Sequence, residues 1–404
     1  MRILWIKTEL LHPVDKGGRI RTYQMLRSLA KRHHVTYLCL DDGTAAPNAR
    51  ALASEYCNQL EIVQFNPPAK GGLRFVFDLV VNLFSPLPYA VARYQSTELR
   101  ARISELAHNA ELVVCDFLMP SVNVPEDLTS RKVLFQHNVE SMIWERHVTV
   151  PQHPIRKIYM RQQWRKMQRF ESRMCHFFDH VVAVSNDDAR IMNERYQIGS
   201  VSAVPTGVDI AFFAHRLAPS HERNELVFVG SMDWMPNEDG IRWFAECVFP
   251  QVRLRVPNAQ LTVVGRSPPA SVRRLANREA GIYVVGTVPD VRPYWERAAV
   301  SIVPLRIGGG TRLKIFEAMA MGIPIVSTSV GAEGLPVVNG DHLLIADSPE
   351  MQTAAIVSLL TDREAARRMA ERALGYVAAN CSWDAVAEQF VATCIKGPEH
   401  ERLG

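Results

Sequence analysis

The chain has 404 residues, of which 47% are hydrophobic and 22% are charged. This length exceeds what one hydrophobic core ordinarily serves, so we expect two domains. The net charge of +4 is too small to indicate nucleic-acid binding, and no nucleic-acid partner is expected.

The predicted elements are short apolar strands that alternate with helical patterns. Strands are expected at residues 2–7, 34–40, 60–65, 112–116, 132–136 and 181–185, and again at 226–229, 260–264, 282–285, 300–303 and 324–327. Helices are expected at residues 19–32, 97–108, 237–248, 270–279, 311–321, 349–361, 363–379 and 383–395. This alternation predicts an α/β protein whose parallel, buried sheets carry helices on both faces.

The N-terminal run at residues 2–7 has the pattern of a strand and not of a signal peptide. The segment at residues 73–84 comes nearest to a membrane span, but Arg74, Asp78 and Asn82 recur in it every four residues. As a helix, it would be apolar on most sides with one thin polar stripe. It is shorter than the about twenty residues that cross a bilayer, so no transmembrane helix is expected.

A cationic stripe is predicted on a later helix. Basic residues recur there every four positions, namely Lys157, Arg161, Arg165, Arg169 and Arg173. The stripe is either a solvated surface or a contact for anionic lipid head groups or a lipid-linked pyrophosphate. On the second interpretation, the protein associates peripherally with the inner face of a membrane, with help from residues 73–84.

A polar stretch interrupts the alternation at residues 205–224. We interpret it as a linker between two Rossmann-like, doubly wound parallel sheets, with one large sheet as the alternative. The predicted domains are then residues 1–205 and 206–382. Ligands of such sheets bind beyond the carboxyl ends of the strands, so two facing halves would place their loops across one cleft.

The seven cysteines are widely spaced and include no Cys-x-x-Cys pair. They indicate neither a disulfide framework nor a zinc cluster, and they fit a reducing, cytoplasmic compartment. The adjacent acids Asp41-Asp42 and Asp187-Asp188 are interpreted as solvated acids or helix caps. We therefore expect neither a metal ion nor a cofactor.

A triple glycine predicts a phosphate-binding loop. Gly308, Gly309 and Gly310 follow a strand that ends near Val303, and a helix is predicted from Thr311. Glycines let the backbone approach phosphate oxygens, and a helix start offers free amides and a partial positive charge. Cations are unfavourable in a first helical turn unless an anion binds there, and this turn carries two, Arg312 and Lys314. The alternative is a flexible loop before a surface helix.

The run from Val303 to Pro324 resembles the C-terminal signature of family-4 retaining glycosyltransferases of the GT-B fold. That signature has a glutamate, seven residues, a second glutamate, Ala-Met-Ala, a glycine and a proline. The second glutamate falls on Glu317, and the resemblance implies that it binds the donor ribose; from its position alone it could equally be a surface residue. The first falls on Gly309, which leaves the donor sugar open. The amides of Gly309 and Gly310 would then contact the sugar or the diphosphate.

Further stretches are similar to the family in the same order and spacing: Gly17-Gly18-Arg19, Gln136-His137-Asn138, Val182–Ser185, Val204–Asp209, Phe228–Asn237, Val263–Arg266 and Gly286–Asp290. The resemblance implies that Gly17, Gly18 and Arg19 lie near the acceptor and the donor phosphates. It also implies that His137 hydrogen bonds to the donor sugar or the reacting phosphate. Without it, a lone histidine at a strand end is more often structural.

A second departure lies after the strand that ends near Val229, where many family members carry an arginine and a lysine for the diphosphate. As a hypothesis, we assign that role to Arg266, Arg312 and Lys314. The resemblance implies an N-terminal acceptor-side domain, onto which the helix at about 383–404 packs back, and a C-terminal donor domain. The resemblance also implies that the configuration is retained; since no carboxylate is a candidate covalent nucleophile, attack on the face that the nucleotide leaves is the expectation consistent with the family.

The implied partners are a nucleotide-sugar donor and an acceptor that is lipid-linked or a polysaccharide, as in bacterial exopolysaccharide assembly. A nicotinamide dehydrogenase would need Gly-x-Gly-x-x-Gly directly after a strand, and the loops after Lys7, Val229 and Val264 lack it. A GT-B sugar-nucleotide epimerase and a non-catalytic nucleotide-sugar-binding protein remain as alternatives.

Overall fold

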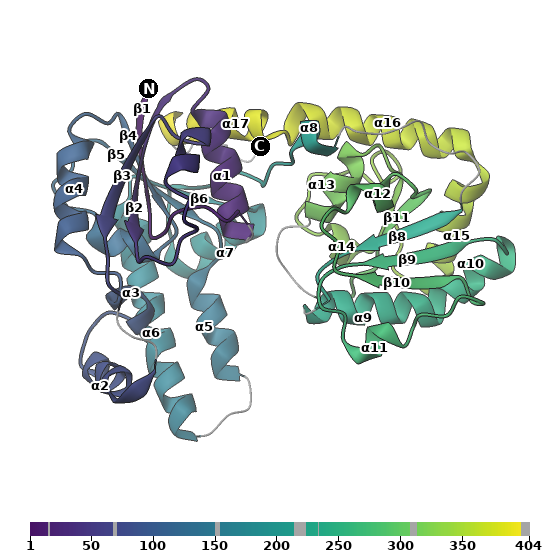
Figure 1. The fold of residues 1–404 in the computed structure, drawn as a ribbon, viewed down its shortest axis with the longest axis horizontal. Coiled ribbons are helices and arrows are strands. Elements are labelled where there is room, and N and C mark those ends of the chain that lie inside the picture. The colour runs from purple at the N-terminus through teal and green to yellow at the C-terminus, as the bar shows by residue number, and fades with distance from the viewer. Residues whose placement is uncertain are drawn as a thin grey trace. The chain divides into compact units, whose positions relative to one another are not determined.

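The computed structural model describes residues 1–14, 17–67, 71–149, 154–213, 224–232, 234–307 and 313–396. The chain divides into two compact units. Unit 1 is Met1–Pro205 with the chain from Val386 onward, and unit 2 is Thr206–Ala385. The chain therefore passes between the units twice (Figure 1).

Unit 1 contains a seven-stranded sheet in the order β3-β2-β1-β4-β5-β6-β7, in which every neighbouring pair is parallel. The strands are β1 Arg2–Lys7, β2 His34–Asp41, β3 Gln59–Gln64, β4 Leu112–Asp116, β5 Arg131–Gln136, β6 His180–Ala183 and β7 Val201–Ala203. All five residues of β4 are buried, as expected of a strand covered on both faces.

The helices of unit 1 are α1 Gly17–Leu29, α2 Gly72–Leu83, α3 Tyr89–Ala92, α4 Thr97–Ala107, α5 Glu140–Thr149, α6 Pro154–Phe177, α7 Asn186–Tyr196 and α17 Trp383–Lys396. Two short 3₁₀ helices, Ala51–Glu55 and Met119–Asn123, complete it. Serine caps start α4 and α7: the Ser96 hydroxyl accepts from the Leu99 amide, and the Ser185 hydroxyl from the Asp188 amide.

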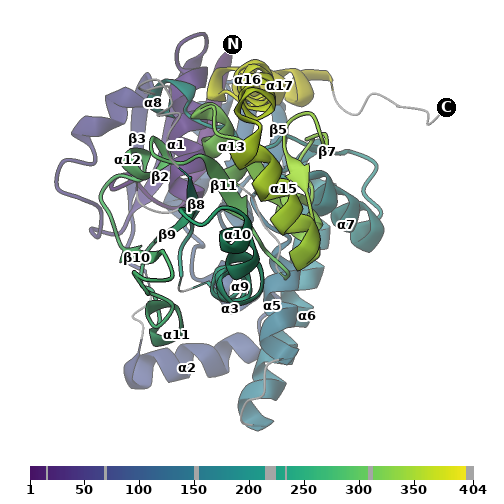
Figure 2. The ribbon, with the colours of Figure 1, turned by 90° about the vertical axis from the view of Figure 1, so that its right-hand side faces the viewer.

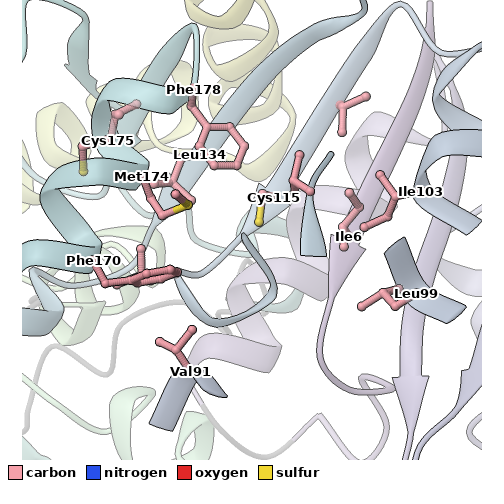
Figure 3. Close-up of a cluster of buried hydrophobic side chains, with 14 of the residues drawn as sticks. Ile6, Val91, Leu99, Ile103, Cys115, Leu134, Phe170, Met174, Cys175 and Phe178 are labelled. Atoms are coloured by element: carbon pink, nitrogen blue, oxygen red, sulfur yellow. The ribbon is translucent and has the colours of Figure 1, made fainter. Parts of the chain in front are cut away.

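The core of unit 1 lies between its sheet and the helices on the faces of the sheet. In Figure 3, Ile6, Cys115 and Leu134 of the sheet lie among side chains of α4 and α6, such as Leu99 and Phe170. These are the apolar positions of strands and amphipathic helices, so the core follows directly from the sequence pattern.

Unit 2 contains a six-stranded parallel sheet in the order β10-β9-β8-β11-β12-β13. Its strands are β8 Glu225–Val229, β9 Gln260–Val264, β10 Ile282–Gly286, β11 Val300–Val303, β12 Ile325–Ser327 and β13 Leu344–Ile345. Its helices are α8 Ile210–Phe213, α9 Met235–Trp243, α10 Phe249–Arg255, α11 Ala270–Arg273, α12 Arg292–Trp295, α13 Leu313–Ala320, α14 Ser329–Ala332, α15 Pro349–Thr361 and α16 Arg363–Asn380.

The predicted α/β fold with two doubly wound parallel sheets is confirmed, and the single-sheet alternative is wrong. The predicted helix at 270–279 is wrong beyond Arg273, because Asn277 forms an antiparallel bridge with Ile282 and turns the chain back. The helix predicted at 237–248 consists of α9 and a π-helical turn, Phe244–Val248. The short strands β7 and β13 were not predicted.

Part of the predicted linker, residues 214–223, lies outside the described residues. Within the described part of the chain, no helix is both long enough and apolar enough to cross a bilayer.

Candidate functional site

Each sheet has one switch point, where the strand order reverses. In unit 1 it lies between β1 and β4, and in unit 2 between β8 and β11. The crevice beyond the carboxyl ends of the strands at a switch point is where open α/β sheets bind ligands. Lys7 and Asp116 end the two strands in unit 1, and Val229 and Val303 end those in unit 2.

A buried carboxylate, Asp116, organises the switch point of unit 1. Its Oδ2 accepts hydrogen bonds from Trp5 Nε1 at 3.0 Å, Lys7 Nζ at 2.9 Å and Thr22 Oγ1 at 2.6 Å. Its Oδ1 lies 2.7 Å from His137 Nε2. Burial alone would raise the pKa of Asp116, but the charge of Lys7 and the hydrogen bonds from His137 and Thr22 outweigh it and lower that pKa. Asp116 is therefore ionised at neutral pH.

His137 lies at this carboxylate, between two aromatic rings. Its ring stacks on Phe117, with centroids 3.9 Å apart, and lies 4.6 Å from Phe135. Burial lowers the pKa of His137 to about 4, although Asp116 opposes this. The imidazole is thus neutral at pH 7 and suited to hydrogen bonding, since a cationic form would be costly here.

Gly18, in the first turn of α1, packs against the ring that stacks on His137. A Cβ atom at Gly18 would lie 2.9 Å from Cζ of Phe117. Phe117 itself has a φ of 74°, which a bulky residue rarely adopts. Gly17 has open space around it. The structure thus brings Gly18 and His137 to one ring, and the need for glycine at Gly18 is steric.

Arg19 points to a pocket instead. Its Nε and Nη2 atoms donate to Glu9 Oε2 at 2.9 and 2.6 Å. The pocket, of about 160 Å³, is lined among others by Glu9, Arg19, Asp41, Asp42 and Tyr94. Carboxylates that accept, a guanidinium that donates and an aromatic ring are groups that can hold a hydroxyl-rich ligand.

In unit 2, two glycines let the ends of neighbouring strands come together. Gly230 follows β8 and Gly265 follows β9. A Cβ atom at Gly265 would lie 1.7 Å from the Gly230 carbonyl oxygen, and one at Gly230 would lie 2.8 Å from Lys314 Nζ. Because Gly230 has no side chain, Lys314 can reach the backbone at the switch point.

Two predicted donor-binding cations meet at the loop after β8. Lys314 Nζ donates to Asn237 Oδ1 at 2.7 Å, and Arg266 Nε donates to Ser231 Oγ at 3.1 Å. Asn237 Nδ2 in turn donates to the Ser231 carbonyl at 2.8 Å. Lys314 and Arg266, from α13 and from beyond β9, are therefore linked through one loop.

Glu317 lies one turn after Lys314 on α13 and is half-buried. Burial raises its pKa to about 7, and the charge of Lys314 partly opposes this rise. A carboxyl group with such a pKa is typical of functional sites. Gly309, Gly310, Thr311 and Arg312 lie outside the described residues, so their predicted roles stay predictions.

Lys7, Asp116 and Asn237 are central here and were not predicted. Lys7 and Asp116 carried a signal in the sequence, because each is the one charged residue at the end of an apolar strand, Ile3-Leu-Trp-Ile-Lys7 and Leu112-Val-Val-Cys-Asp116. Such charges are buried only when paired. Asn237 ends one of the stretches that resemble the family, Phe228–Asn237, but no role was assigned to it. Among the described residues, no group of three or more His, Cys, Asp or Glu side chains is arranged to hold a metal ion.

Family models match both parts of the chain. The model for Glycosyltransferase Family 4 matches residues 16–212, and that for Glycosyl transferases group 1 matches residues 223–362. The chain is a glycosyltransferase of the GT-B type.

This glycosyltransferase is 22% identical over 392 residues to an uncharacterized 44.6 kDa protein in the cps region of Klebsiella pneumoniae, covering 94% of this chain and 96% of that protein. Sucrose-phosphate synthase from Thermosynechococcus elongatus superposes with a TM-score of 0.63 at 18% identity, covering 97% of this chain and 98% of the synthase. The Anabaena protein Alr3699/HepE in complex with UDP and glucose also gives 0.63, at 15% identity, covering 98% of the glycosyltransferase and 100% of that chain. These structures share its fold.

Proposed function

We propose that the glycosyltransferase binds a nucleotide-diphosphate sugar at the switch point of unit 2 and transfers the sugar to an acceptor held by unit 1. The observation that carries this proposal is the link between Lys314 and Arg266 through one loop, with Glu317 one turn away. Two cations suit a diphosphate, and a carboxylate suits the adjacent hydroxyls of a ribose. The UDP bound by the structurally similar Anabaena protein supports the same ligand class.

In the proposed mechanism, the cations stabilise the nucleoside diphosphate as it leaves, where negative charge develops. Lys314 and Arg266 supply this charge, together with Arg312 beyond the described residues. His137 donates or accepts a hydrogen bond at the donor sugar or the reacting phosphate, and Asp116 holds its imidazole. We propose transfer with retained configuration, without a covalent carboxylate intermediate and without a metal ion.

We further propose a saccharide or lipid-linked acceptor from exopolysaccharide assembly. The pocket beside Arg19 supports a hydroxyl-rich acceptor, because Glu9, Asp41 and Asp42 can accept from hydroxyl groups. The relative in the cps region supports the exopolysaccharide assignment. The seven cysteines are free, which supports a cytoplasmic setting, at the inner face of the membrane where such acceptors would lie.

A thermal-shift panel of UDP-, GDP-, dTDP- and ADP-sugars, with and without EDTA, tests the donor site. A ligand at a hundred times its Kd should stabilise the fold by about 2.7 kcal/mol. We expect one nucleotide to raise Tm regardless of EDTA, and Glu317→Ala to lose that shift while it stays folded. The exposed acid Glu279 of the same unit provides the control Glu279→Ala, which should keep the shift.

Catalysis is tested separately by nucleotide release. Release of the nucleoside diphosphate should require a saccharide or lipid-linked acceptor. Binding without release for any acceptor would favour the non-catalytic alternative. A shift that is unchanged in Glu317→Ala would remove the ribose assignment.

A further inference from the structure

The one buried residue of helix α2 in unit 1 is polar, Asn82, and it lies near the C-terminal end of the helix. Asn82 is only 5% exposed; its Nδ2 donates to the Leu87 carbonyl at 3.1 Å, and its Oδ1 accepts from Gln163 Nε2 of α6 at 2.9 Å. Lys166 Nζ, also from α6, donates to the carbonyls of Asn82 and Leu83 at 2.5 and 3.2 Å. The C-terminal end of α2 is therefore held on α6 by polar contacts.

Most of the side chains that α2 exposes to solvent are apolar; the charged one among them is Arg74. Leu73 is 90% exposed, Phe84 88% and Phe77 66%, and Val76, Val80 and Val81 are each at least half exposed. A surface helix ordinarily places such large apolar side chains against the core. A contiguous exposed apolar surface of this kind marks an interaction site. Figures 1 and 2 show α2 beside α6, away from the sheet of unit 1.

The exposed charges of the neighbouring helix α6 are all positive. Its exposed lysine and arginine side chains are Arg156, Lys157, Arg161, Arg165, Arg169 and Arg173. Its single acid, Glu171, is fully buried and accepts from the backbone amides of Glu140 and Ser141 at 2.8 and 2.9 Å. Along α6, the apolar Ile158 is 72% exposed among these cations. The cations are therefore not neutralised by acids of their own helix.

We propose that the exposed side of α2 and the cations of α6 form a docking surface for an anionic lipid bilayer. The apolar side chains of α2 enter the boundary between head groups and acyl chains, and the α6 cations contact the anionic head groups. A second copy of the chain fits less well, because pairing α2 with itself about a two-fold axis would bring two cationic α6 helices together. This proposal goes beyond glycosyl transfer and does not depend on it.

Co-sedimentation of the full chain with sucrose-loaded vesicles tests this surface. One set of vesicles is phosphatidylcholine alone, and the other contains one third phosphatidylglycerol. We expect binding to the anionic vesicles, weaker at high salt, and at least a tenfold loss of affinity in Phe77→Ser/Phe84→Ser and in Arg161→Glu/Arg165→Glu. Leu254, which is 84% exposed in unit 2, gives the apolar control Leu254→Ser, and the exposed Arg255 and Arg278 give the charge control Arg255→Glu/Arg278→Glu. Both controls should bind as the unaltered protein does.

Three results would overturn the proposal. The first is that the unaltered protein fails to bind anionic vesicles, and the second is that the α2 variant binds them as well as its control does. The third is that the protein dimerises through α2, so that Phe77→Ser/Phe84→Ser is monomeric and vesicles have no effect. The nucleotide-induced Tm shift reports folding and donor binding in every variant, so failure here is distinguishable from failure of the donor site.

Discussion

At the scale of single residues, the pair of Lys7 and Asp116 is the most informative feature of unit 1. Both side chains are almost completely buried, and they lie 2.9 Å apart at the ends of adjacent strands. Two charges removed from water are costly, so their retention indicates a role other than stability. The Asp116 carboxylate uses its second oxygen to approach His137, which gives it a positioning role at the imidazole.

Asp116→Asn should destabilise unit 1 by about 3–5 kcal/mol, because Lys7 would remain buried without a countercharge. Equilibrium unfolding in urea measures this change. Asp127 is an exposed acid of the same unit, so Asp127→Asn should leave the midpoint nearly unchanged. Equal midpoints for the two variants would contradict a dependence of the fold on the buried pair.

The pKa of Glu317 predicts a pH dependence of donor binding, if this carboxylate binds the ribose as proposed. Its pKa of about 7 leaves it mostly protonated at pH 6 and mostly ionised at pH 8. If the ionised form binds, the affinity for a sugar nucleotide should rise about tenfold between these values and then level off. Titration calorimetry measures this, with a sugar nucleotide because its diphosphate does not titrate in this range. Glu317→Gln should bind more weakly and without this slope; a slope that persists in Glu317→Gln would assign it to another group.

At the scale of elements, the close approach of β8 and β9 depends on a missing side chain. In Gly265→Ala, the new Cβ atom would overlap the carbonyl oxygen of Gly230, so the strand ends must separate. We expect a loss of several kcal/mol in unit 2, about the cost of overpacking a core or more. Gly375 in α16 has open space around it, and Gly375→Ala should instead stabilise by about 1 kcal/mol. Urea unfolding of both variants measures these changes. If both variants shifted the free energy of unfolding in the same direction, the steric requirement for glycine at Gly265 would be contradicted.

The sequence predicted the elements well where a hydrophobic period was strong. The strands from residues 2–7 and 112–116 have the predicted bounds, because each contains an unbroken apolar run, at residues 3–6 and 112–115, that ends at a charged residue. β13 has only two residues, too few to show a period. The apolar helix at residues 73–84 was considered from its composition, but its orientation was not, since the contacts of Asn82 with α6 are tertiary.

The candidate site was predictable only in part, because some of its contacts join residues that are far apart in the sequence. His137, Lys314 and Glu317 could be proposed from the sequence because they sit in motifs at strand ends and helix starts. Asp116 joins β4 to side chains more than 90 residues away in sequence, such as Thr22. No local pattern contains such a contact, although a charge at the end of an apolar strand is a usable signal for it.

At the scale of the whole molecule, the C-terminal helix α17 completes a core that the N-terminal part of the chain begins. Phe390 is fully buried, with its ring centroid 5.5 Å from that of Trp5 and 5.1 Å from that of Phe135. Unit 2 has a core of its own, which includes Phe249. Each unit should therefore unfold as its own cooperative structure.

Calorimetry of matched core variants tests this division. Phe390→Ala should destabilise unit 1 by about 3–5 kcal/mol and lower the transition of that unit, because it removes a ring from the core around Trp5. Phe249→Ala should lower the other transition by a similar amount. A bound sugar nucleotide should raise mainly the transition that Phe249→Ala lowers, since Lys314, Arg266 and Glu317 all lie in unit 2. If Phe390→Ala lowered the transition that Phe249→Ala lowers and left the other transition in place, α17 would be stabilised mainly by unit 2. The division of the chain at Val386 would then be wrong.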